Sequence, residues 1–95
     1  MKMIMKISDV FESKRHGVLV SGSNQLLDDV AREEIDRLIG KKIRVVADGR
    51  KMRDFEVFGV DLSKSIVGKL NITISVGNDL APDILVAGAE VFALS

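Results

Sequence analysis

Chemically reactive residues are scarce in this chain. It has no cysteine, tryptophan or tyrosine, one proline and a single histidine, His16. Without cysteine, disulfides, thiolate metal sites and thiol nucleophiles are all excluded, which fits a reducing compartment. A lone imidazole cannot complete a transition-metal site, and no nucleophile, base and orienting group can be named together. We therefore expect no metal, no cofactor and no enzymatic activity.

The chain also lacks a net charge and a long apolar run. Its 14 Lys and Arg residues balance 14 Asp and Glu residues, so any attraction to nucleic acid must come from a local patch. No stretch approaches the roughly 20 apolar residues of a membrane-spanning helix, and residues 1–7 do not form the apolar core of a signal peptide. We expect a cytoplasmic protein that does not engage a membrane.

What the chain has instead is short alternation of apolar and polar residues between glycines, the pattern of β-strands. Its 95 residues are enough for one core, so residues 1–95 are expected to form a single domain. The expected strands are residues 3–7, 17–22, 43–47, 55–62 and 69–76, then one longer or two short strands within 84–94. Closing so many short strands removes exposed edges. The sequence therefore predicts a mainly β fold, a closed antiparallel barrel of six or seven strands.

One segment follows a different period. Over residues 26–39, apolar residues recur at steps of three and four, which predicts an amphipathic helix inserted into the barrel. Gly40 follows directly, as a glycine C-cap would. We expect this helix to bury Leu27, Val30, Ala31 and either Ile35 or Leu38.

Four short segments occur in an order known from one family of barrels. They are Val10-Phe11, Gly17-Val18-Leu19-Val20-Ser21-Gly22, Ile39-Gly40-Lys41-Lys42-Ile43-Arg44-Val45-Val46 and Asp83-Ile84-Leu85-Val86-Ala87-Gly88-Ala89-Glu90-Val91. Together they resemble the second domain of elongation factor Tu and related translational GTPases, in which a G-x-V-x-x-G strand leads to a V-G-x-x-V-x-V segment. The resemblance covers residues 7–94 and implies a stand-alone translation-factor barrel. It departs at residues 26–39, where the family has a brief connection, so no binding residue is carried over.

The phosphate-binding loop of such a factor is absent. G-x-x-x-x-G-K-[ST] places backbone amides and a lysine around phosphates, but here Ser23 and Asn24 follow Gly22 in place of that lysine and hydroxyl residue. We expect no nucleotide binding.

Eight basic residues fall into three groups that could contact phosphate if the fold brought them to one face. They are Lys14 and Arg15; Lys41, Lys42 and Arg44; and Arg50, Lys51 and Arg53. RNA-binding barrels also expose aromatic rings for stacking, whereas Phe55, Phe58 and Phe92 lie in expected strands and are assigned to the core. Two hypotheses remain open. One is a module that binds RNA or a ribonucleoprotein, and the other is a protein-interaction or self-assembly module using the inserted helix or a strand edge.

Overall fold

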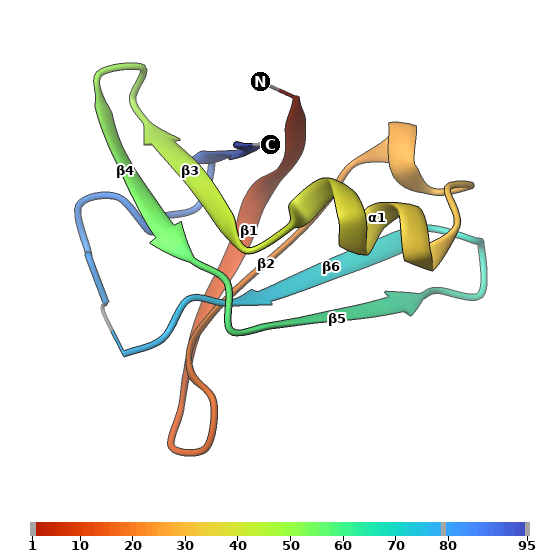
Figure 1. Ribbon diagram of the computed structural model, residues 1–95, viewed down its shortest axis with the longest axis horizontal. Coiled ribbons are helices and arrows are strands. Elements are labelled where there is room, and N and C mark those ends of the chain that lie inside the picture. Colours follow the sequence, from red (N-terminus) through yellow and green to blue (C-terminus); the bar gives the residue numbers. More distant parts are fainter. Residues whose placement is uncertain (1, 79, 95) are drawn as a thin grey trace.

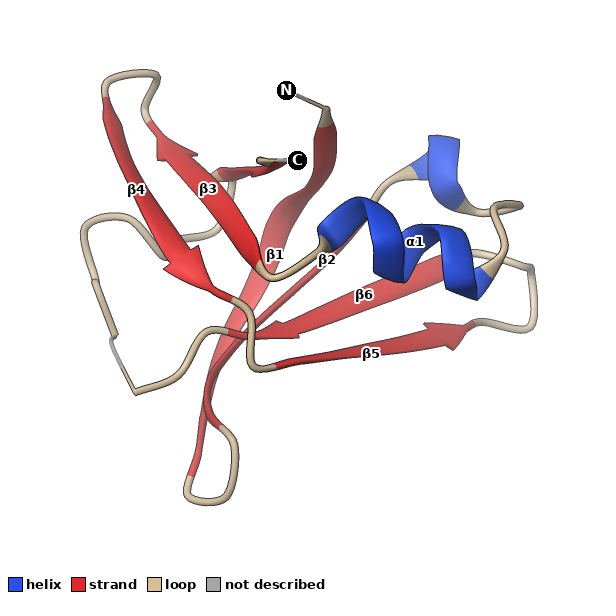
Figure 2. Cartoon of the chain, viewed as in Figure 1, coloured by secondary structure: helices blue, strands red, loops and turns tan. Residues whose placement is uncertain are grey.

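Seven antiparallel strands form one sheet in the computed structural model, which describes residues 2–78 and 80–94 (Figure 1). The strands are β1 (Met3–Ser13), β2 (Gly17–Ser23), β3 (Lys42–Ala47), β4 (Lys51–Glu56), β5 (Gly59–Lys64), β6 (Leu70–Ser75) and β7 (Glu90–Ala93). Their order across the sheet is β4-β3-β7-β1-β2-β6-β5. The prediction of a mainly β, antiparallel fold with a helix is confirmed (Figure 2).

The sheet is not closed, so the prediction of a closed barrel is not met. β4 and β5 are its two edges, although they are consecutive in the chain and lie next to each other at a corner (Figure 1). The expected strand 55–62 is split at this corner. Val57 N–H donates to the Lys41 carbonyl at 2.9 Å, and Phe58 N–H donates to the Ser75 carbonyl at 2.9 Å. The chain thus changes its partner from β3 to β6 here, and β4 cannot continue into β5 as one strand.

The inner face of the curved sheet carries the core. Pairing Ile43 with Phe55 and Val20 with Ile74 puts alternate apolar residues on this face. β1 departs from strict alternation because its pairing with β7 shifts register between Met3 and Met5. The buried apolar side chains of the strands are Ile4, Met5, Ile7, Val18, Val20, Ile43, Val45, Ala47, Phe55, Leu70, Ile72, Ile74, Val91 and Ala93.

The expected helix over residues 26–39 is two shorter elements. A 3₁₀ turn, η1 (Gln25–Leu27), is capped by Asn24, and α1 (Arg32–Ile39) follows after a turn. The backbone of Asp28 is still helical, and the break lies at Ala31, which is extended with a ψ of 145°. The Asp28 carboxylate accepts a hydrogen bond from Leu70 N–H of β6 at 3.0 Å, which ties the segment before the break to the sheet.

The apolar side of this segment covers the core largely as expected. Leu27, Ile35 and Ile39 are buried, and Val30 and Leu38 are half-buried against the same cluster. Ala31 is exposed, contrary to the prediction, because it is the N-cap residue of α1 and not part of a continuous helix. α1 ends at Gly40, which has a φ of 65°, as the glycine cap predicts.

The last strand is shorter than predicted. Residues 82–85 form a turn in which the N–H groups of Ile84 and Leu85 both donate to the Ala81 carbonyl at 2.9 Å. Only Glu90–Ala93 pairs with β1 and β3. Neither helical element in residues 2–78 and 80–94 is long and apolar enough to cross a bilayer.

Candidate nucleic-acid interface

The structure does not bring the three basic groups to one surface. Lys14 and Arg15 lie in the turn between β1 and β2, whereas Arg50 and Lys51 lie where β3 turns into β4. Figure 1 shows these two hairpins at opposite ends of the molecule. Lys41 lies between α1 and β3, away from both tips. A single basic face made of all eight residues is therefore absent.

The cations of β3 and β4 are further divided between two faces of the sheet. Lys42 pairs with Glu56, and Arg44 pairs with Asp54, so these side chains share the outer face. Arg53 is paired with Val45 instead and lies on the opposite face. Its guanidinium carbon is 5.2 Å from the centroid of the Phe55 ring, which is a cation–π arrangement. The face that holds Lys42 and Arg44 thus also holds two carboxylates.

Arg44 is already engaged by one of these carboxylates. Its Nε lies 2.7 Å from Asp54 Oδ1, and its Nη2 lies 3.1 Å from Asp54 Oδ2, so the two side chains form a bidentate salt bridge. The hydrogen bond from Arg44 lowers the pKa of Asp54, and the same contact raises the pKa of Arg44. An anionic ligand would have to compete with Asp54 for this guanidinium.

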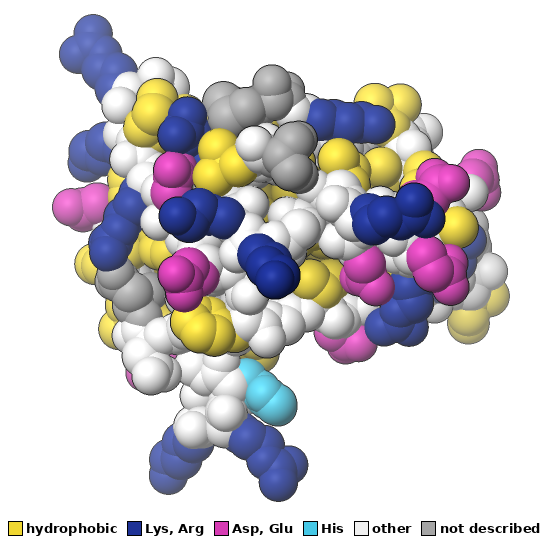
Figure 3. All heavy atoms as spheres, in the orientation of Figure 1, with side chains coloured by type: hydrophobic (Ala, Val, Ile, Leu, Met, Phe, Trp, Pro, Cys, Tyr) yellow, Lys and Arg dark blue, Asp and Glu magenta, His cyan; other side chains and the backbone are white. Residues whose placement is uncertain are grey.

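Lys14 and Arg15 are placed differently, at the tip of the protruding β1–β2 hairpin. Ser13 Oγ accepts hydrogen bonds from the N–H groups of Arg15 and His16, both at 3.2 Å, which fixes the turn. Lys14, Arg15 and His16 are all exposed, and no carboxylate of the described residues forms an ion pair with them. Figure 3 shows basic side chains and the histidine together on this projection. The tip is a local positive patch on a neutral chain.

A groove of about 580 Å³ begins at this tip, and we call it the hairpin groove. Its described lining is Lys14, Arg15, His16, Gly17, Phe58, Gly59, Ser75, Val76, Gly77 and Asn78. None of these residues is acidic. The groove therefore combines cations, an aromatic ring and a side-chain amide, the groups that contact phosphates, base faces and base edges.

Two glycines build the floor of the groove. Gly17 and Gly77 pair as an isolated parallel bridge, and Val18 N–H donates to the Gly77 carbonyl at 2.6 Å. A Cβ on Gly17 would collide with that carbonyl oxygen, and one on Gly77 would lie 2.9 Å from the Phe58 ring. Both have positive φ, 75° and 85°. The close approach of these backbones holds the hairpin against the segment that carries Asn78.

Phe58 is the aromatic residue whose predicted burial is wrong. It was expected in the core, but its side chain is 67% exposed, because it occupies the corner between β4 and β5. Phe55 is buried as expected, and Phe92 is half-buried. Phe11 on β1 is also half exposed. Two phenylalanine rings are therefore exposed on the surface, although the strand pattern does not predict it.

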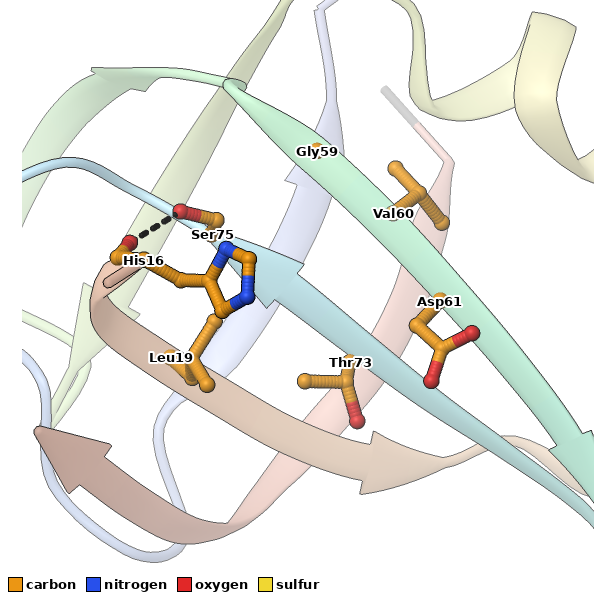
Figure 4. A pocket seen from close by; sticks show the side chains of 7 residues that line it. All are labelled: His16, Leu19, Gly59, Val60, Asp61, Thr73 and Ser75. Atoms are coloured by element: carbon orange, nitrogen blue, oxygen red, sulfur yellow. Dashed lines mark hydrogen bonds between the residues drawn. The ribbon is translucent and has the colours of Figure 1, made fainter. Parts of the chain in front are cut away.

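A second hollow of about 350 Å³ adjoins the hairpin groove and shares His16, Gly59 and Ser75 with it (Figure 4). Ser75 Oγ donates to the His16 carbonyl oxygen at 2.7 Å, which anchors the hairpin over β6. The His16 ring stands at one end of the hollow, and Asp61 and Thr73 lie toward the other (Figure 4). Because Asp61 is a carboxylate, phosphate groups are favoured only at the hairpin end.

No known protein family, curated protein or solved structure matches this chain. Within residues 2–78 and 80–94, no group of three or more histidine or acidic residues is arranged to hold a metal ion. The hairpin groove is thus the candidate site on its own geometry.

Proposed function

We propose that this chain is a non-catalytic module that binds single-stranded RNA, free or within a ribonucleoprotein, in the hairpin groove. The observation that carries the proposal is the convergence of Lys14, Arg15 and the exposed Phe58 ring on one groove. The cations neutralise backbone phosphates, and the ring stacks on a base, which needs no particular sequence. Asn78 supplies an amide for a base edge.

The resemblance to the second domain of translational GTPases supports this proposal, because that domain is a barrel that contacts transfer RNA. On this proposal the open sheet is a variant of that barrel. α1 and η1 cover the part of the hydrophobic core that a closed sheet would enclose. Leu27, Ile35 and Ile39 belong to the same buried cluster as the strands. No residue in the described lining of the hairpin groove comes from residues 25–39, so the insertion contributes nothing to the groove.

The proposal is tested by fluorescence anisotropy with a labelled, unstructured RNA of about 12 nucleotides, within the site size of small barrels. Replacing both Lys14 and Arg15 with Ala should weaken binding and reduce the slope of log K against log salt by about 1.4, or 0.7 per lost phosphate contact. Phe58→Ala should weaken binding by about 5- to 150-fold, equivalent to a stacking contribution of about 1–3 kcal/mol.

The matched control removes the same charge from the other hairpin. Arg50→Ala with Lys51→Ala should leave the affinity and the salt slope close to those of the wild type, because these residues lie at the opposite end of the molecule (Figure 1). The proposal is overturned if the control weakens binding as much as the Lys14 and Arg15 pair. It is equally overturned if the wild type shows no binding at low salt.

A further inference from the structure

The second hollow, which adjoins the hairpin groove, lies on the face of the sheet opposite the core. Leu19 of β2 pairs with Ser75 of β6, which pairs with Gly59 of β5, and the residues next to Leu19 and Ser75 in the sequence are buried in the core. Thr73 pairs with Asp61 two residues along the same strands, about 7 Å away. A Cβ on Gly59 would lie 4.0 Å from the Ser75 Cβ, so the hollow is open where Gly59 lacks a side chain.

The polar atoms on the sheet side of the second hollow are hydrogen-bond acceptors. Ser75 Oγ donates its hydrogen to the His16 carbonyl oxygen at 2.7 Å, and Thr73 Oγ1 donates to Ser21 Oγ at 3.5 Å. Both hydroxyl hydrogens are thus directed at protein oxygens, which leaves lone pairs for a ligand. The Asp61 carboxylate can only accept, and its side chain forms no hydrogen bond or ion pair within the described part of the chain.

The four bases of RNA differ in how well they fit such a set of acceptors. The Watson–Crick edge of guanine carries two adjacent donors, N1–H and the N2 amine, and one carboxylate accepts both. Adenine, cytosine and uracil each place an acceptor beside their donor, and that acceptor would face the Asp61 charge. A cationic ligand is disfavoured, because Lys14 and Arg15 line the adjoining groove and repel it. Neutral guanine therefore suits both ends of the combined site.

We propose that the second hollow is a guanine-selective subsite, in which the Asp61 carboxylate accepts hydrogen bonds from guanine N1–H and the N2 amine. This inference rests on the proposed binding of RNA in the hairpin groove and adds a base preference to it. A nucleotide reaches the hollow from the groove because His16, Gly59 and Ser75 line both spaces. The volume of about 350 Å³ is within the range of small-molecule sites, and Leu19 supplies apolar surface for the face of the base (Figure 4).

The test compares three labelled RNAs of about 12 nucleotides by fluorescence anisotropy. One contains only uridine, one repeats U-U-G, and the last has inosine in place of each guanosine, so that only the N2 amine is missing. The wild type should bind the U-U-G RNA about 5- to 150-fold more tightly than the uridine RNA, which is the discrimination expected of one bidentate base contact. The inosine RNA should have an intermediate affinity, because inosine keeps one of the two donors.

Asp61→Asn and Asp9→Asn are matched variants for this test. Each removes one exposed carboxylate from the same row across the sheet, since Asp9 pairs with Ser21, Ser21 with Thr73, and Thr73 with Asp61. Asp9 is outside the described lining of the second hollow and of the hairpin groove. Asp61→Asn should lose most of the preference for guanosine over inosine, yet bind the uridine RNA no more weakly than the wild type, because losing a negative charge favours RNA. Asp9→Asn should keep the wild-type preference.

The outcomes separate the subsite from RNA binding itself. If the wild type binds the uridine RNA as tightly as the U-U-G RNA, the guanine subsite is overturned and the proposed RNA binding stands. A preference that persists in Asp61→Asn, or that Asp9→Asn loses to the same extent, also overturns the subsite, since guanine is then recognised elsewhere. If none of the three RNAs binds the wild type at low salt, the proposed function is overturned and the subsite with it.

Discussion

Gly17→Ala offers a quantitative test of how the hairpin is fixed. Gly17 has a φ of 75°, so a side chain there is strained by about 1–2 kcal/mol. Its Cβ would also collide with the Gly77 carbonyl oxygen, which accepts the Val18 N–H at 2.6 Å. Moving this backbone weakens that hydrogen bond and the one from Val76 N–H to the Val18 carbonyl, each with a net contribution of about 1 kcal/mol.

The expected total is a loss of about 3–4 kcal/mol in the free energy of unfolding. Gly49→Ala is the matched control, because Gly49 has a φ of 70° but no atom within 4 Å of its would-be Cβ. It should lose only the strain of about 1–2 kcal/mol. Urea denaturation measures both losses from the shift in midpoint, provided that the m-value is unchanged. Equal losses in the two variants would refute the argument that the Gly17–Gly77 approach is structurally required.

Three further outcomes follow from the packing and charge of particular residues. Ile35→Asp should destabilise the domain by several kcal/mol in thermal denaturation, because it buries a charge, whereas Glu34→Gln on the exposed face of α1 should change stability little. Arg44 lowers the pKa of Asp54, so the stabilisation from this pair is present above the unfolded pKa of the carboxyl group and is lost as pH falls through the lowered folded pKa. The stability difference between wild type and Asp54→Asn should therefore shrink toward zero in acid. Phe58→Ala should shift the melting temperature only slightly, since the ring is mostly exposed.

Local patterns in the sequence were sufficient to predict several of the secondary-structure elements. The β-branched run of residues 17–22, the apolar residues of 43–47 and the alternation of 69–76 each predict a strand whose ends lie within one residue of the observed ones. Gly40 ends α1 because only a residue that tolerates positive φ fits there, and this too is readable from the sequence.

The predictions of secondary structure were wrong where contacts between residues distant in the sequence determine the backbone conformation. Nothing within residues 55–62 reveals that Val57 N–H bonds to the Lys41 carbonyl while Phe58 N–H bonds to the Ser75 carbonyl, yet these bonds split the expected strand into β4 and β5. Likewise, the helical period of residues 26–39 is real, but the backbone is extended at Ala31, after a segment that the hydrogen bond from Leu70 N–H to the Asp28 carboxylate ties to β6. Both departures from local periodicity thus lie where the chain forms hydrogen bonds with distant parts of the sheet.

For the same reason, only part of the candidate site could be predicted from the sequence. A turn that contains Lys14 and Arg15 is recognisable as an exposed cationic tip. The approach of Phe58 and Asn78 to that tip depends on the contact between Gly17 and Gly77, which are separated by most of the chain. The isolated glycines at these positions are the one signal in the sequence, since such residues often mark close approaches of backbone.

The location of the RNA site is tested most directly by NMR. Amide shifts of ¹⁵N-labelled protein would be followed while the unstructured RNA is added. Binding in the hairpin groove predicts that the largest shifts fall on residues 14–17, 58–59 and 75–78, with little change at residues 50–53. Shifts concentrated on residues 41–44 and 50–53, or no shifts at low salt, would contradict the account.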